Sequence, residues 1–119
     1  MDLKFDNRTP VYLQLIDYFK QVITSEEMAL GEELPSRREL ASRLKINPNT
    51  VQRAFKEMEE TGLIVTERNL PSKVTSDKQI IKQLREELIN DAVDELIETV
   101  QSVNVPLEDL LQLVKQKYQ

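Results

Sequence analysis

The 119-residue sequence predicts a mainly α-helical protein with a small β-wing, in which a winged helix-turn-helix domain precedes a C-terminal α-helical hairpin. Three observations lead to this prediction. Helix-capping signals recur at short intervals in the first half of the chain. Two short β-branched segments separated by a turn follow the third predicted helix. A long apolar stripe at helical spacing then occupies most of the remaining chain. We therefore expect a winged helix-turn-helix domain over residues 1–76 and a helical domain over residues 77–119.

The first helix is expected to begin at Thr9 and Pro10. Thr9 would be the N-cap, and Pro10 would occupy the first turn, because that turn does not need the amide hydrogen that proline lacks. Apolar residues then recur at helical spacing and predict one buried face, formed by Leu15, Ile16, Phe19, Val22 and Ile23. The pattern ends near Ser25. The connector that follows is expected to contain a very short strand at residues 33–34.

The second and third helices are expected to form a helix-turn-helix. Ser36 and Glu39 have the spacing of a capping box, so the second helix starts at Ser36 and ends near Lys45. Residues 47–48 are Asn-Pro, which predicts an N-cap followed by the first turn of the third helix. Gly62 is a typical helix terminator and ends it. Because only two or three residues separate the two helices, they must cross rather than run side by side.

The wing and the tail complete the predicted fold. Residues 63–67 and 72–75 have strand-like compositions, and residues 68–71 form the turn between them. From Asp77 onward the pattern predicts a helix of about 26 residues. The sequence Asn-Val-Pro at residues 104–106 breaks this helix, and a final short helix follows.

The apolar stripe of the tail is too broad for two helices to bury between themselves. On the long helix it comprises Ile80, Ile81, Leu84, Leu88, Ile89, Ala92, Val93, Leu96, Ile97, Val100 and Val103. We expect a symmetric homodimer through the C-terminal helices. The alternative is a hairpin that caps the N-terminal domain of the same chain. Both arrangements fit the periodicity.

The charge distribution predicts an anionic partner although the whole chain has a net charge of −5. Between Ser36 and Lys56 there are six basic residues, and Glu39 is the only acid. Such concentration of positive charge in one segment is typical of a nucleic-acid-binding surface. The alternative interpretation is that these side chains merely solvate two helices.

The third helix separates into an apolar face and a hydrogen-bonding face. At 100° per residue, one side carries the apolar residues Val51, Ala54, Phe55 and Met58. The opposite side carries Asn49, Gln52, Arg53 and Lys56, all hydrogen-bond donors, and Thr50 lies on its shoulder. Arginine suits guanine O6 and N7, whereas asparagine or glutamine suits the N6 and N7 edge of adenine. We therefore expect this face to enter the major groove of double-stranded DNA.

The remaining candidates flank this face. Arg37 and Arg38 lie at the start of the second helix, where free backbone amides also attract phosphate. For Asn47 a capping role is favoured over the alternative of a base contact, and Lys56 either contacts phosphate or is solvated. Thr50 is within reach of a phosphate or a thymine methyl group.

Composition excludes several other classes of function. The sequence contains no histidine and no cysteine, which removes Cys/His zinc sites, disulfides, thiol nucleophiles and Ser-His catalysis. We expect no cofactor, no metal site and no enzymatic activity. No apolar run reaches the roughly 18 residues of a membrane span, and the N-terminus lacks a signal-peptide core, so we expect a cytoplasmic protein without a membrane partner. A competing hypothesis is a winged-helix adaptor that binds proteins and not DNA.

Four ordered segments resemble the N-terminal domain of GntR-family transcription regulators. They are PVYLQL at residues 10–15, LPSRRELA at 34–41, NPNTV at 47–51 and ETGLI at 60–64. The short helical tail resembles the YtrA subfamily. The resemblance implies a dimeric bacterial repressor that binds an inverted-repeat operator, often near ABC-transporter genes. It identifies no small-molecule effector.

The resemblance also implies DNA contacts at particular positions. The matching positions that touch DNA in the family are Arg38, Asn47, Asn49, Thr50 and Gln52, with Ser36 and Arg53 nearby. Tyr12 matches a position where the family's first helix approaches the DNA backbone. On the wing, Arg68 is retained, but residues 69–73 replace the family's glycine-rich tip. Arg68 and Lys73 are the candidate wing contacts, although without glycine the backbone approaches a minor groove less freely.

Overall fold

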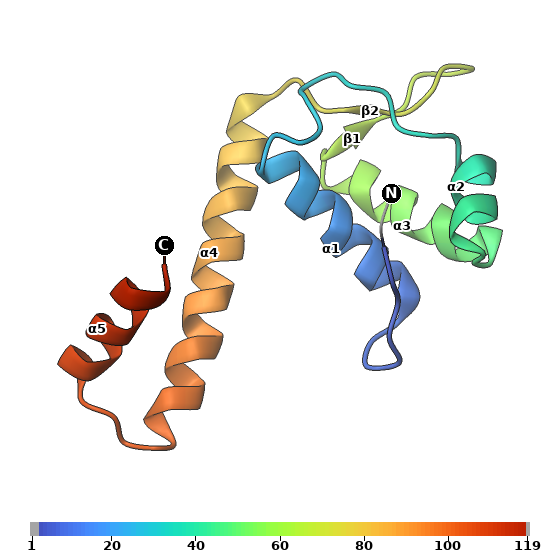
Figure 1. Ribbon diagram of the computed structural model, residues 1–119. Coiled ribbons are helices and arrows are strands. Elements are labelled where there is room, and N and C mark those ends of the chain that lie inside the picture. Colours follow the sequence, from blue (N-terminus) through green and yellow to red (C-terminus); the bar gives the residue numbers. More distant parts are fainter. Residues whose placement is uncertain (1–2, 119) are drawn as a thin grey trace. The chain divides into compact units, whose positions relative to one another are not determined.

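The computed structural model describes residues 3–118 and confirms a mainly helical winged helix-turn-helix followed by C-terminal helices (Figure 1). The elements in chain order are α1 (Val11–Thr24), α2 (Arg37–Leu44), α3 (Pro48–Glu60), β1 (Ile64–Val65), β2 (Lys73–Val74), α4 (Lys78–Gln101) and α5 (Leu107–Lys117). The chain forms two compact units, Met1–Arg85 and Glu86–Gln119, called here the winged-helix unit and the tail unit. The boundary between them falls inside α4. The functional division at residues 76 and 77 stays a prediction.

The core of the winged-helix unit forms where α1, α2 and α3 meet. Phe19 of α1 packs edge-on against Phe55 of α3, with ring centroids 6.3 Å apart. Both side chains are fully buried, as are Leu15 and Leu40. The first turns of α4 join this core through Ile81, and the Arg85 guanidinium donates a hydrogen bond to the Thr24 carbonyl at 2.7 Å. The five residues predicted to form the buried face of α1 are all buried.

The start of α1 differs from the prediction by one residue. Pro10, not Thr9, is the N-cap, because its backbone stays extended with ψ at 141° and its carbonyl accepts from the Leu13 and Gln14 amides. The Thr9 carbonyl accepts instead from the Gln14 side chain at 2.8 Å. The same side chain bonds both the amide and the carbonyl of Asp6. Gln14 thus ties the preceding loop to the helix and leaves Thr9 outside it.

Side-chain caps begin both helices of the helix-turn-helix as predicted. The Ser36 hydroxyl accepts from the Glu39 amide at 3.0 Å, and the Asn47 carboxamide oxygen accepts from the Asn49 amide at 2.8 Å. Each bond satisfies an amide that the helix leaves free. The Glu39 carboxylate does not close the second half of the capping box, since it turns toward Arg43 one turn later.

Left-handed residues end α2 and α3. Lys45 has φ at 56° and redirects the chain within two residues, so that α3 crosses α2. Gly62 has φ at 79°, and a Cβ atom there would lie 3.0 Å from the Ile80 side chain at the start of α4. Glycine therefore meets two requirements at this position, the backbone conformation and the close packing.

The wing is shorter than predicted but has the expected antiparallel pairing. Ile64 pairs with Val74, and Val65 pairs with Lys73. The regular ladder stops there, and beyond it a hydroxyl contact of 2.6 Å joins Thr66 and Ser72. The sequence predicted longer strands here. A side-chain hydrogen bond thus joins the two segments where the backbone ladder has already ended.

Two further features hold the wing. The predicted strand at residues 33–34 is reduced to a single bridge between Glu33 and Lys73, which places the connector along the free edge of β2. At the tip, Asn69 has φ at 63°, and the Leu70 amide bonds to the Glu67 carbonyl. Asparagine tolerates this left-handed conformation, so the turn closes without the family's glycine.

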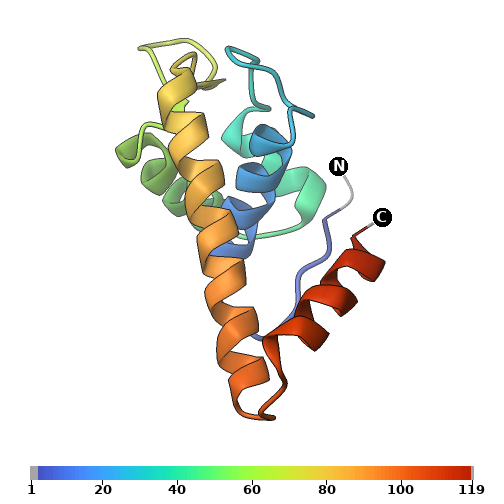
Figure 2. The same cartoon turned by 90° about the vertical axis from the view of Figure 1, so that its left-hand side faces the viewer.

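The two helices of the tail unit do not cover one another's apolar side chains. The chain reverses at residues 102–106 between α4 and α5, and α5 does not pack closely along α4 (Figure 2). None of the described residues of α5 is buried, and in α4 only Ile81 is, within the other unit. The exposed large apolar residues of the tail unit are Ile89, Val93, Leu96, Val103, Val105, Leu107, Leu111, Leu113, Val114 and Tyr118.

Within residues 3–118, no helix is long and apolar enough to cross a membrane. The same part of the chain contains no group of three or more acidic side chains placed to hold a metal ion.

Candidate nucleic-acid interface

The two faces predicted for α3 are confirmed. Its apolar face is built into the core, where Val51, Ala54, Phe55 and Met58 are at most 1% exposed. The side chains of Asn49, Gln52, Arg53 and Lys56 are exposed, and Thr50 is half-buried at the edge. Packing of the apolar face thus fixes which side of α3 is free to meet a ligand. That free side is acid-free over the first turns and rich in hydrogen-bond donors.

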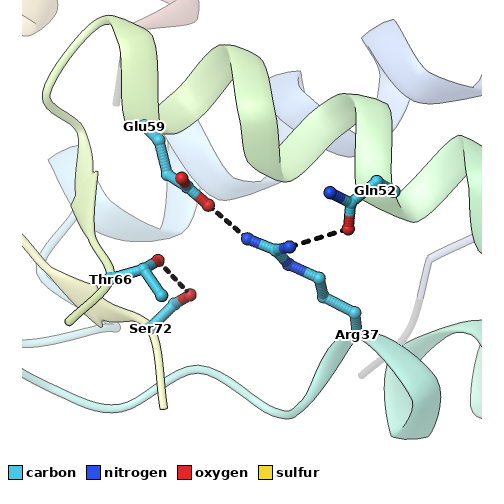
Figure 3. Close-up of polar contacts among 5 residues, drawn as sticks. All are labelled: Arg37, Gln52, Glu59, Thr66 and Ser72. Carbon is cyan, nitrogen blue, oxygen red and sulfur yellow. Dashed lines mark hydrogen bonds and ion pairs between the residues drawn. The ribbon is translucent and has the colours of Figure 1, made fainter. Parts of the chain in front are cut away.

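The Arg37 side chain extends from α2 to α3 and makes three contacts there, of which Figure 3 shows those with Gln52 and Glu59. One guanidinium nitrogen, Nη1, donates to Gln52 Oε1 at 2.7 Å, and Nη2 forms an ion pair with Glu59. The guanidinium carbon lies 5.1 Å from the centre of the Phe55 ring. The Arg37 side chain is 34% exposed, so its guanidinium group is partly withdrawn from solvent. Arg37 thus binds elements of the protein at the place where a phosphate contact was predicted.

Arg53 and Tyr12 form a second contact between helices. The Arg53 guanidinium carbon lies 3.8 Å from the centre of the half-buried Tyr12 ring, which is a cation–π arrangement. Tyr12 belongs to α1 and Arg53 to α3, so the two candidates come together from positions 41 residues apart. A stacked guanidinium keeps the N–H groups at its edge available to an acceptor.

The other helix candidates lie at the two capped helix starts. Arg38 is exposed beside Arg37 in the first turn of α2. The Ser36 hydroxyl and the Asn47 amide oxygen are engaged in the caps, which leaves the Asn47 amino group as its available donor. The candidate wing residues, Arg68 at the turn and Lys73 in β2, are both exposed.

Sequence reasoning did not find the partners of the two arginines. Glu59 lies seven residues after Gln52, which places both on one side of α3 two turns apart. That spacing was visible in the sequence. The angle at which α2 crosses α3, which brings Arg37 between them, was not.

A helix-turn-helix with a β-wing, whose second helix exposes an acid-free, donor-rich face, defines a winged-helix nucleic-acid-binding protein. Residues 11–74 match the family model described as bacterial regulatory proteins, gntR family. The chain belongs to the GntR family of DNA-binding transcription regulators. Membership confirms the resemblance found in the sequence and places the chain among transcription regulators rather than enzymes.

The likeness extends through the tail to small regulators of this family. The chain is 30% identical over 115 residues to the uncharacterized HTH-type transcriptional regulator YhcF of Bacillus subtilis, covering 97% of this chain and 95% of that protein. It is 34% identical over 109 residues to the HTH-type transcriptional repressor YtrA of the same organism, covering 91% and 84%. The solved structure of a GntR family transcriptional regulator from Listeria monocytogenes superposes with a TM-score of 0.89 at 34% identity, covering 94% and 98%.

Proposed function

We propose that this chain is a repressor that binds an inverted-repeat operator as a homodimer and controls its own operon. The observation that carries the proposal is the exposed face of α3, where Asn49, Gln52 and Arg53 lie together with no acid among them. YtrA, a relative named as a repressor, supports the direction of regulation.

In the proposed complex, the N-terminal half of α3 lies in the major groove. Asn49, Gln52 and Arg53 read base edges, because amide and guanidinium groups match the pattern of donors and acceptors there. Thr50 at the edge of this face contacts a phosphate or a thymine methyl group.

The surrounding residues contact the phosphate backbone. Arg38 and Lys56 supply exposed positive charge, and Tyr12 approaches the backbone beneath Arg53. The start of α2, after Ser36, presents the backbone amides of residues 37 and 38 to phosphate, since the hydrogen bonds to Ser36 use only the amides of residues 39 and 40, and Asn47 offers its side-chain amino group.

In this proposal Arg37 does not contact DNA itself, because its guanidinium already binds Gln52 and Glu59. It contacts Gln52, and Gln52 contacts the DNA. The wing residues Arg68 and Lys73 contact the backbone beside the major groove. Residues 1–76 are therefore proposed to bind DNA, and residues 77–119 are proposed to form the dimer.

The homodimer is proposed to form through α4 and α5. The apolar side chains exposed on the tail unit need a partner surface, and a second copy offers the same surface by two-fold symmetry. Such a dimer reads two half-sites of an inverted repeat, with recognition helices about 34 Å apart.

The site of action is the cytoplasm, because that is where a bacterial regulator meets its DNA. ABC-transporter genes are the expected targets, on the basis of the resemblance to YtrA-type regulators. No effector is included in the proposal.

The test is a fluorescence-anisotropy titration with a duplex taken from the promoter region of the protein's own gene. An unrelated duplex of equal length and a salt series are measured in parallel. We expect tighter binding to the promoter duplex and a steep loss of affinity with salt, because phosphate contacts release counterions. Equal binding to both duplexes would contradict the proposed operator. No binding to either duplex at low salt would support an adaptor function instead.

A further inference from the structure

We propose that Arg37 is a positioning residue that turns the amino group of Gln52 outward, so that Gln52 reads guanine and not adenine. This proposal rests on the proposed function, since it assumes that α3 lies in the major groove. It differs from the expectation drawn from glutamine alone, which is adenine.

The orientation of the Gln52 amide follows from the chemistry of its partner. A guanidinium group has five N–H donors and no acceptor. The Gln52 atom that faces Arg37 Nη1 at 2.7 Å must therefore be the carbonyl oxygen, because an amino group would set donor against donor. The Gln52 amino group is then the part of the carboxamide that Arg37 does not engage, on a residue that is exposed on α3; Figure 3 shows Arg37 joined to the oxygen.

The guanidinium is itself held in place. The Glu59 carboxylate binds its other terminal nitrogen, and the Phe55 ring lies 5.1 Å from its centre. Arg37 is also the first residue of α2, directly after Ser36, which is the N-cap of that helix. These contacts come from α3 and from the start of α2, so the donor that faces Gln52 has a defined position before any ligand arrives.

The base preference follows from the groups that remain free on Gln52. Bidentate binding of adenine requires one donor and one acceptor, for N7 and the N6 amino group. Among residues 3–118 neither hydrogen of the Gln52 amino group has a partner, whereas the carbonyl oxygen accepts from the Arg37 guanidinium. Guanine presents two acceptors, N7 and O6, and no donor beside them on that edge. A group that chiefly donates is therefore matched better by guanine.

The test is a selection from a duplex library with a randomised centre, made with wild-type protein and with Gln52→Ala, Arg37→Met and Arg37→Lys. Anisotropy titrations then use duplexes that differ at single base pairs. Arg37→Met keeps the side-chain stem over Phe55 but removes the donors. Arg37→Lys keeps a cationic donor and is the matched control.

We expect Gln52→Ala to lose a preference at one base pair, where the wild type favours guanine over adenine by about tenfold. Arg37→Met is expected to reduce this ratio to threefold or less, or to reverse it toward adenine, while Arg37→Lys retains it. A merely structural role for Arg37 would change affinity for all duplexes equally and leave this ratio unchanged.

Three outcomes would overturn the proposal: a wild-type preference for adenine that depends on Gln52, no base preference that depends on Gln52, or an unchanged ratio in Arg37→Met. If thermal unfolding followed by circular dichroism shows that Arg37→Met does not fold, the comparison of wild type with Gln52→Ala decides alone. If the wild type shows no sequence-specific binding, the proposed function itself is contradicted. That result is distinguishable from a failure of the proposal for Arg37 alone.

Discussion

At the scale of single residues, the cation–π pair of Arg53 and Tyr12 joins α3 to α1 at the face proposed to bind DNA. The stacked ring holds the guanidinium without using its edge N–H groups. Arg53 is therefore preorganised to donate to a base, and less side-chain entropy is lost when it binds.

We expect Arg53→Ala to weaken operator binding by about 1–3 kcal/mol and to relax the preference at one base pair, because a bidentate contact is removed. Competition titrations against duplexes with single substitutions measure both effects. Arg43→Ala is the control, since it removes another exposed arginine of the same basic segment that lies outside the proposed contact set. Equal losses for the two variants would show that charge alone matters.

Lys56→Ala is expected to act differently. Removal of a phosphate contact should weaken binding to all duplexes by a similar factor and reduce the slope of log K against log salt by about 1. Affinity measured at several salt concentrations provides the slope. An unchanged slope would mean that Lys56 is only solvated.

Sequence alone predicted the two faces of α3 but not what its polar side chains touch. Helical periodicity assigns Val51 and Phe55 to one side without knowledge of any other element. The contacts of Arg37 with Gln52 and Glu59 depend on the crossing of two helices, which periodicity does not contain. The burial of single side chains on α3 was therefore predictable from the sequence, and the contacts between polar side chains of different helices were not.

At the scale of elements, side-chain caps determine where the two helices of the helix-turn-helix begin. The Asn47 oxygen at 2.8 Å from the Asn49 amide begins the recognition helix immediately after the turn. The cap and the DNA contact proposed for this residue are separable, because they use different atoms of the side chain.

Asn47→Ala is expected to lower the free energy of unfolding by about 1 kcal/mol, whereas Asn47→Asp should restore most of it, since aspartate keeps the capping oxygen. Urea denaturation followed by circular dichroism measures both. DNA binding by Asn47→Asp should remain weakened, because aspartate has no amino group and repels phosphate. Full affinity in this folded variant would limit Asn47 to the capping role.

Most element boundaries were predictable because local chemistry sets them. Ser36, Asn47 and Gly62 begin or end helices where the sequence indicated. Thr9 is not the N-cap, because its carbonyl accepts from the side chain of Gln14, five residues later, a contact that the capping pattern does not include. The strands of the wing were overestimated because the regular ladder ends at Val65 and hydroxyl bonding replaces it.

At the scale of the whole molecule, the helices of the tail unit expose apolar surface that they do not cover for one another. Ile89, Val93 and Leu96 lie on one side of α4 at helical spacing and are 39–58% exposed. Surface of this kind on a pair of helices is typical of an association interface.

We expect size-exclusion chromatography with light scattering to show a wild-type dimer at micromolar concentration. Val93→Glu should shift it to a monomer, because a charge would have to be buried at the interface. Its operator affinity should fall as well, since each half-site is then bound separately. Glu95→Gln changes a residue on the other side of the helix and serves as the control. A wild-type monomer at this concentration would contradict the dimer.

The contact between Tyr12 and Arg53 has a practical consequence, because the chain contains three tyrosines and no tryptophan. Phenol emission is therefore not masked by indole, and one of its three sources lies directly beneath the guanidinium that is proposed to bind a base. Docking onto an operator should change the ultraviolet fluorescence of the unlabelled protein. Replacement of Tyr12 by phenylalanine should abolish that signal while the ring beneath Arg53 is retained.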